Sequence, residues 1–164
     1  MSIKIRELDG AADALACLEI YRYYIENTTV TFDEETPTPE EFTDRVKRIT
    51  ESYPFFVADD GSRVVGFAYL DIFNPRSAYR RTADLTIYLA HDAGGRGVGT
   101  MLYTALEDAA RARGIANIIS LITSDNAASL AFHKKHGFAE VGHLTDVGVK
   151  FGQLLSVDFY QKTL

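Results

Sequence analysis

The spacing of apolar and polar positions changes several times along this chain, and each change predicts a boundary between a helix and a strand. Apolar residues recur at helical spacing over 11–26, from Pro39 to about Tyr53, from the end of a glycine-rich segment to Arg113, and over 126–136. Alternating or β-branched runs predict strands over 3–7, 55–58, 64–70, 83–89, 118–122, 138–143 and 155–160. The resulting order, β-α-α-β-β-β-α-β-α-β-β, predicts an α/β protein with a mixed, mostly antiparallel sheet and helices on both faces.

Two short segments mark where elements begin or turn. Thr38-Pro39-Glu40-Glu41 combines a capping threonine, a proline in the first turn and a glutamate that completes a capping box, so a helix begins here. Asp59-Asp60-Gly61-Ser62 separates two apolar runs and predicts a hairpin.

Composition narrows the class of protein. The 164 residues, 46% of them hydrophobic, contain no repeat and no long linker, so we expect a single domain over 1–164. We expect no membrane partner, since no apolar run approaches the ~18–20 residues of a membrane span, and the N-terminus lacks an apolar signal segment. The net charge of −6 argues against a nucleic-acid partner. The single cysteine, Cys17, fits a reducing compartment, so we expect a cytoplasmic protein.

The segment Gly94-Gly95-Arg96-Gly97-Val98-Gly99-Thr100 lies between a predicted strand and a predicted helix. The first N–H groups of a helix have no internal partners and lie at the positive end of its dipole, where a pyrophosphate binds well. The segment lacks the lysine of a Walker loop, and its glycines do not match the dinucleotide fingerprint. On the segment alone, a plain glycine-rich turn and a phosphate site remain equal alternatives.

Several short stretches spread over nearly the whole chain form a specific pattern in their order and spacing. They are Tyr24–Phe32, Tyr53–Ala58, Gly66–Tyr69, Ala78–Thr82, Ile87–Leu89, Asn126–Ser129 with His133, Gly137–Phe138 and Gly148–Gly152. With the glycine-rich segment, they resemble the GNAT family of N-acetyltransferases, and more closely its branch of phosphinothricin and methionine sulfoximine acetyltransferases. The resemblance implies the GNAT fold, with six to seven strands and about four helices, and acetyl-CoA as co-substrate.

The resemblance also implies roles for individual residues. The proposed general base of the branch, usually glutamate, matches Asp84, and His133 matches a position near the thioester. Cofactor binding falls on the strand edge and on two helix starts: Ile87, Tyr88, Leu89, Gly95, Arg96, Gly97, Val98, Gly99, Thr100, Asn126 and Ser129. Without the resemblance, a solvent-facing Asp84 and a satisfied structural His133 would be the simpler interpretations.

The amine site is expected around the loop before strand 83–89, because that loop lines the substrate site in the resembling branch. The candidates are Phe32, Arg76, Ser77, Ala78, Tyr79 and Arg80. An arginine here can clamp a substrate carboxylate bidentately, and Phe32 can supply an apolar wall. A solvated turn is an equal alternative for these arginines.

Three departures from the family pattern stand out. The acyl-CoA signature of the family is Gln/Arg-x-x-Gly-x-Gly/Ala, and Gly94 replaces its first residue. Asp84 is one methylene shorter than the usual glutamate, and Leu154 stands where relatives often have tryptophan. We expect no metal, since His91, His136 and His143 have no ligand spacing with one another or with Cys17.

The sequence thus predicts an enzyme that acetylates the α-amino group of a small amino-acid-like substrate such as phosphinothricin, methionine sulfoximine or methionine sulfone, by direct transfer in a ternary complex. A different amine, such as a polyamine or a peptide N-terminus, and a non-catalytic acyl-CoA-binding module are the alternatives. The resemblance implies a homodimer. The physiological amine and the choice among Asp84, His133 and a water as base stay open.

Overall fold

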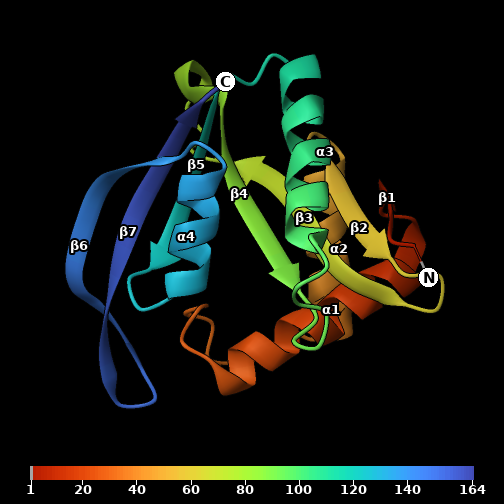
Figure 1. Cartoon of the computed structure of the whole chain (residues 1–164), viewed down its shortest axis with the longest axis horizontal. Helices are drawn as coiled ribbons and strands as arrows, with labels where there is room; N and C mark the ends of the chain where they lie inside the picture. Colours follow the sequence, from red (N-terminus) through yellow and green to blue (C-terminus); the bar gives the residue numbers. More distant parts are fainter. Residues whose placement is uncertain (1) are drawn as a thin grey trace.

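The computed structural model describes residues 2–164, and its strands form one seven-stranded sheet in the order β1-β2-β3-β4-β5-β7-β6 (Figure 1). The strands are β1 (Lys4–Glu7), β2 (Phe55–Asp59), β3 (Val64–Ile72), β4 (Thr82–Leu89), β5 (Asn117–Thr123), β6 (Ala139–Lys150) and β7 (Gln153–Thr163). The helices are α1 (Gly10–Asn27), α2 (Pro39–Thr50), α3 (Val98–Ala112) and α4 (Ala127–Lys135), with a short 3-10 turn, η1 (Ser77–Tyr79). The predicted order of elements and the mixed α/β fold are confirmed.

The sheet divides between β4 and β5. These two strands form the parallel pair of an otherwise antiparallel sheet, and their pairing covers Thr82–Asp84 against Asn117–Ile119. Figure 1 shows them diverging from a common end near the C-terminus. Residues 85–89 of β4 therefore pair with β3 on one side and border a V-shaped gap on the other.

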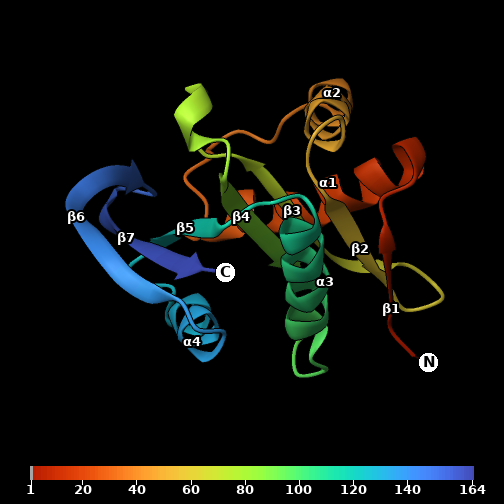
Figure 2. The ribbon, with the colours of Figure 1, turned by 90° about the horizontal axis from the view of Figure 1, so that it is seen from above.

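Helices cover both faces of the sheet, with α1 and α2 on one side and α3 and α4 on the other (Figure 2). The predicted stripe of α2 is buried at Phe42, Val46 and Ile49. The core joins these side chains to the apolar faces of α1, α3 and the central strands. In the described chain, 2–164, we find no helix with both the length and the apolar character that crossing a membrane requires.

A local signal in the sequence sets the start of α2. The capping box of α2 is present: the Glu41 N–H donates to Thr38 Oγ1 at 3.2 Å, and the Thr38 N–H donates to Glu41 Oε2 at 2.8 Å.

The strand predicted over 138–143 is too short, because β6 continues to Lys150. Most of β6 is exposed at the edge of the sheet, and its pairing with β7 is shifted at two places, so its apolar residues do not alternate.

Candidate active site

The gap between β4 and β5 is a cleft of about 460 Å³. Its walls come from the β4 edge, from β5, from the first turns of α3 and α4, and from the end of α1. The residues that line it are Tyr24, Val30, Leu85, Thr86, Ile87, Tyr88, Leu89, Ala90, His91, Gly94, Gly99, Ser120, Leu121, Ile122, Asn126, Ala128, Ser129, Phe132 and His133. Six of the predicted site residues line this cleft together with His133: Ile87, Tyr88, Leu89, Gly99, Asn126 and Ser129.

The glycine-rich segment closes one end of the cleft at the start of α3. Gly95 and Gly97 adopt positive φ angles of 79° and 72°, and a Cβ at either position would meet nothing within 4 Å. Within the described chain, no hydrogen-bond acceptor is found for the main-chain N–H groups of residues 95–100, whereas the Met101 N–H donates to the Gly97 carbonyl. Six free donors at the positive end of a helix dipole fit an anion such as a pyrophosphate. Arg96, whose guanidinium lies 4.0 Å from the Asp60 carboxylate, adds a positive charge beside them.

The free edge of β4 offers a second set of polar main-chain groups. The Ala90 N–H donates to the Val65 carbonyl, so alternate residues of β4 direct their groups toward β3 and the residues between them, Ile87 and Leu89, face the gap. The Tyr24 hydroxyl donates to the Leu89 carbonyl at 2.5 Å. The Ile87 groups and the Leu89 N–H are thus placed to pair with an extended amide-containing chain.

A short polar network at α4 lines the wall of the cleft that lies opposite the β4 edge. Asn126 caps this helix by accepting from the Ser129 N–H at 3.2 Å. His133 Nδ1 lies 2.7 Å from the Ser129 carbonyl, so this nitrogen carries the proton, and Nε2 accepts from the Ser120 hydroxyl at 2.9 Å. His133 is buried, which lowers its pKa. It is therefore a neutral imidazole with both nitrogens in use.

Asp84 lies on the other face of the sheet from His133. It shares its face of β4 with Tyr88, whose ring contacts Tyr21 and Tyr24 of α1. Burial, and then repulsion from Asp71 on β3, raise the pKa of Asp84 to about 6. The two predicted catalytic residues are therefore not neighbours. Thr86, one pleat further along, borders both the large cleft and a 70 Å³ pocket on the Asp84 side.

The loop predicted to bind the amine precedes β4. Arg76, Ser77, Ala78, Tyr79 and Arg80 are all exposed, and η1 forms within them. Neither guanidinium of Arg76 and Arg80 makes an ion pair with another residue of the described chain. Phe32 is 38% exposed and packs directly on Gly148, leaving no room for a side chain there.

Sequence reasoning missed two groups that shape the cleft. Ser120 is the polar residue inside the apolar run 118–122, and this break in the pattern was an available signal. The loop after α1 crosses from that helix to β5 and β6: Thr123 Oγ1 donates to the Thr29 carbonyl at 2.9 Å, and Lys150 Nζ donates to the Thr31 carbonyl at 2.9 Å. No local sequence pattern announces these contacts, because they join residues about a hundred positions apart.

Comparisons with known proteins agree with this geometry. The model of the Acetyltransferase (GNAT) family matches residues 17–138. A phosphinothricin N-acetyltransferase of Streptomyces viridochromogenes is 35% identical over 93% of this chain and 83% of its own length. An L-methionine sulfoximine/L-methionine sulfone acetyltransferase of Pseudomonas paraeruginosa is 36% identical over 100% of this chain and 96% of its own. The crystal structure of a GNAT superfamily phosphinothricin acetyltransferase from Sinorhizobium meliloti in complex with AcCoA superimposes with a TM-score of 0.94 at 34% identity, covering 100% of this chain and 89% of that one.

Proposed function

The chain belongs to the Acetyltransferase (GNAT) family and is an N-acetyltransferase that uses acetyl-CoA, and from this premise we propose that its acceptor is the α-amino group of a small amino-acid-like substrate. Phosphinothricin, methionine sulfoximine and methionine sulfone are the proposed substrates, by analogy with the relatives. The observation that carries the proposal is the open edge of β4, which runs toward six free N–H donors after its carboxyl end. The loop before the start of the same strand carries two arginines that make no ion pair within residues 2–164.

The cofactor is assigned to the large cleft. Its pyrophosphate lies against the N–H groups of residues 95–100, namely Gly95, Arg96, Gly97, Val98, Gly99 and Thr100. Its pantetheine amides pair with the gap-facing main-chain groups of Ile87 and Leu89, between which Tyr88 lines the cleft. Asn126 and Ser129 border the pantetheine from the start of α4. The thioester then sits where β4 and β5 diverge. An oxyanion that develops there is stabilised by a main-chain N–H of β4 that faces the gap.

Direct transfer then requires removal of a proton from the amine. An α-amino group with a pKa near ~7.8 is neutral in roughly one molecule in ten at pH 7, so a moderate base is sufficient. We assign that role to Asp84, acting through a water, because its raised pKa of about 6 keeps it ionised at neutral pH while improving it as a base. His133 is assigned the positioning of Ser120 rather than proton transfer, because both of its nitrogens are already hydrogen-bonded.

In this proposal, acetyl-CoA and the amine reach the gap between β4 and β5 from opposite faces of the sheet. The amine nitrogen attacks the thioester carbonyl carbon, the tetrahedral intermediate collapses with loss of the CoA thiolate, and the proton taken from the amine passes through Asp84 toward solvent or the thiolate. Arg76 and Arg80 hold the substrate carboxylate, while Phe32 and Tyr79 provide apolar walls. Arginine suits this task because its planar fork binds a carboxylate bidentately.

We also propose that the chain forms a single domain over 1–164 and acts as a cytoplasmic homodimer. Support for a second copy comes from apolar side chains exposed along β6 and the adjoining turn: Val141, Leu144, Val147, Val149, Phe151 and Leu154, with exposures of 45–65%. Support for a reducing compartment comes from Cys17, a single buried thiol. Light scattering on the purified chain distinguishes a dimer from a monomer.

The test is a thiol-release assay with acetyl-CoA and a panel of amines. The panel contains phosphinothricin, methionine sulfoximine, methionine sulfone, common L-amino acids, spermidine and a short peptide. Turnover on the first three supports the proposal. Turnover on spermidine or the peptide alone keeps the enzyme and the cofactor but refutes the acceptor. Silence across the panel, with acetyl-CoA binding demonstrated by calorimetry, favours a non-catalytic acyl-CoA-binding module over the proposal.

A further inference from the structure

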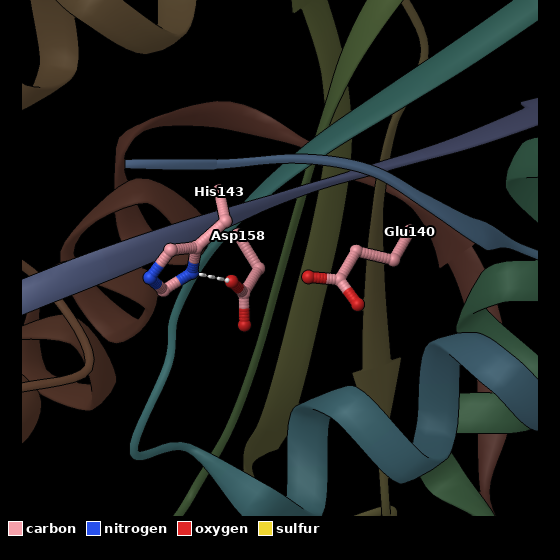
Figure 3. A group of neighbouring side chains, drawn as sticks. All are labelled: Glu140, His143 and Asp158. Carbon is pink, nitrogen blue, oxygen red and sulfur yellow. Dashed lines mark hydrogen bonds and ion pairs between the residues drawn. The ribbon is translucent and has the colours of Figure 1, made fainter. Parts of the chain in front are cut away.

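A cluster of three side chains on β6 and β7 lies outside the acetyl-transfer site. His143 Nδ1 lies 2.5 Å from Asp158 Oδ1, and the Glu140 carboxylate faces the same space, as Figure 3 shows. One ligand atom from each of the three residues lies within 4.8 Å of the other two. The three residues approach one another through strand pairing, since His143 is the register partner of Asp158.

A β-bulge creates this arrangement. Residues three apart on a regular strand point to opposite faces, so Glu140 and His143 would be separated by the sheet. The register of β6 against β7 shifts between Glu140 and Gly142, which inserts one extra residue and turns both side chains to the same side. The spacing of the histidines and Cys17 along the sequence predicted no metal site. That spacing does not reveal Glu140, His143 and Asp158, because they are brought together by strand pairing and by a β-bulge.

Asp158 is the buried member of the cluster. It is 7% exposed, and among residues 2–164 its carboxylate is hydrogen-bonded to the side chain of His143 alone. No lysine or arginine of that range lies within ion-pair distance of Asp158 or Glu140. Two carboxylates that face one space beside an imidazole, with no lysine or arginine paired to them, form a set of ligand atoms for a cation.

We infer that Glu140, His143 and Asp158 form a binding site for one divalent transition-metal ion, with Zn²⁺ the best fit. One imidazole nitrogen and two carboxylate oxygens, without a thiolate, suit Zn²⁺, and three protein ligands leave a fourth position for water. The ion replaces the proton between His143 and Asp158, so the imidazole binds as a neutral ligand. Because the ligands come from two strands, the ion cross-links β6 to β7, and β7 pairs with the cleft-lining β5. None of the three residues lines the large cleft.

Metal binding to the full chain, freed of metal with a chelator, tests the site. Zn²⁺ is titrated in competition with a chromogenic chelator, and Co²⁺ is used as a spectroscopic substitute. The expected result is one ion per chain, with d–d absorption typical of four ligands, and a melting temperature raised by about 5–10 °C at a hundredfold excess over Kd. Glu140→Gln and His143→Gln each weaken binding by at least about tenfold. Asp146→Asn is the matched control, an exposed carboxylate on β6 outside the cluster, and it leaves the affinity unchanged.

Two results overturn the inference. One is a Zn²⁺ affinity weaker than about 1 mM. The other is equal binding by the wild-type chain, Glu140→Gln and His143→Gln, which identifies an adventitious ion only. Both substitutions are at exposed positions, so they test the site even if Asp158→Asn, which alters a buried residue, fails to fold.

Discussion

Replacing Asp84 by asparagine is expected to make the protein more stable and the enzyme much slower. Burial and the neighbouring Asp71 raise the pKa of Asp84 from 3.8 to about 6, so the folded state disfavours its ionised form. That difference corresponds to about 3 kcal/mol of destabilisation once both folded and unfolded chains are ionised. The penalty is absent well below pH 3.8, grows as pH rises between the two pKa values, and is complete above about pH 6. Asp84→Asn removes it.

The expected gain in unfolding free energy is about 3 kcal/mol at pH 8 and about half of that at pH 5. For a chain of this size it corresponds to a melting temperature raised by about 6–12 °C at pH 8. Urea denaturation at the two pH values measures the gain, and Asp108→Asn, an exposed carboxylate on α3, is the control with no pH-dependent change. Over the same range, kcat of the wild-type enzyme falls as pH drops below about 6.

Loss of a general base costs about 10²–10⁴ in kcat, so Asp84→Asn is slow at every pH and has no titration near pH 6. An asparagine variant less stable than the wild type at pH 8 would show that burial does not penalise this carboxylate. A variant with undiminished kcat would remove Asp84 from the chemistry. The combined result of higher stability and lower activity is specific to a residue held in an unfavourable state for its function.

Substitutions at three further places test other parts of the site. Arg76→Ala or Arg80→Ala should lower kcat/KM for an amino-acid acceptor by about 10–100-fold, which is the value of a charge-assisted hydrogen bond. An analogous amine without a carboxylate should show no such loss, and equal losses on both acceptors would refute the carboxylate clamp. His133→Asn should lower stability by about 1–3 kcal/mol, because the buried Ser120 hydroxyl loses its acceptor, and should leave the pH dependence of kcat near 6 intact; loss of that dependence would make His133 the base. Gly97→Ala should lower stability by about 1 kcal/mol and weaken acetyl-CoA binding in a calorimetric titration, since φ at this position is +72°. Gly94→Ala, at an equally open position without positive φ, is its control.

The sequence predicted those features that local chemistry determines. The capping box at Thr38 set the start of α2, and the glycine-rich segment preceded α3 as expected. The placement of Asp84 and His133 on opposite faces was beyond prediction, because it depends on which helix covers which face of a strand. The length of β6 was missed for a related reason: an exposed edge strand buries neither face fully, so its residues lose the alternation that marks a strand.

The open edge of β4 is a feature that most sheets avoid. An unpaired strand edge is a site for unwanted association, and proteins usually cover or shorten it. Here the edge lies inside the sheet, recessed between β4 and β5, and the loop after α1 is tied across to β5 through Thr29 and Thr123. Under the proposed function, the extended pantetheine chain pairs with the gap-facing main-chain groups of Ile87 and Leu89 at this edge. The parallel pairing covers only Thr82–Asp84 of β4, so the edge from Leu85 to Leu89 stays open and forms one wall of the cleft.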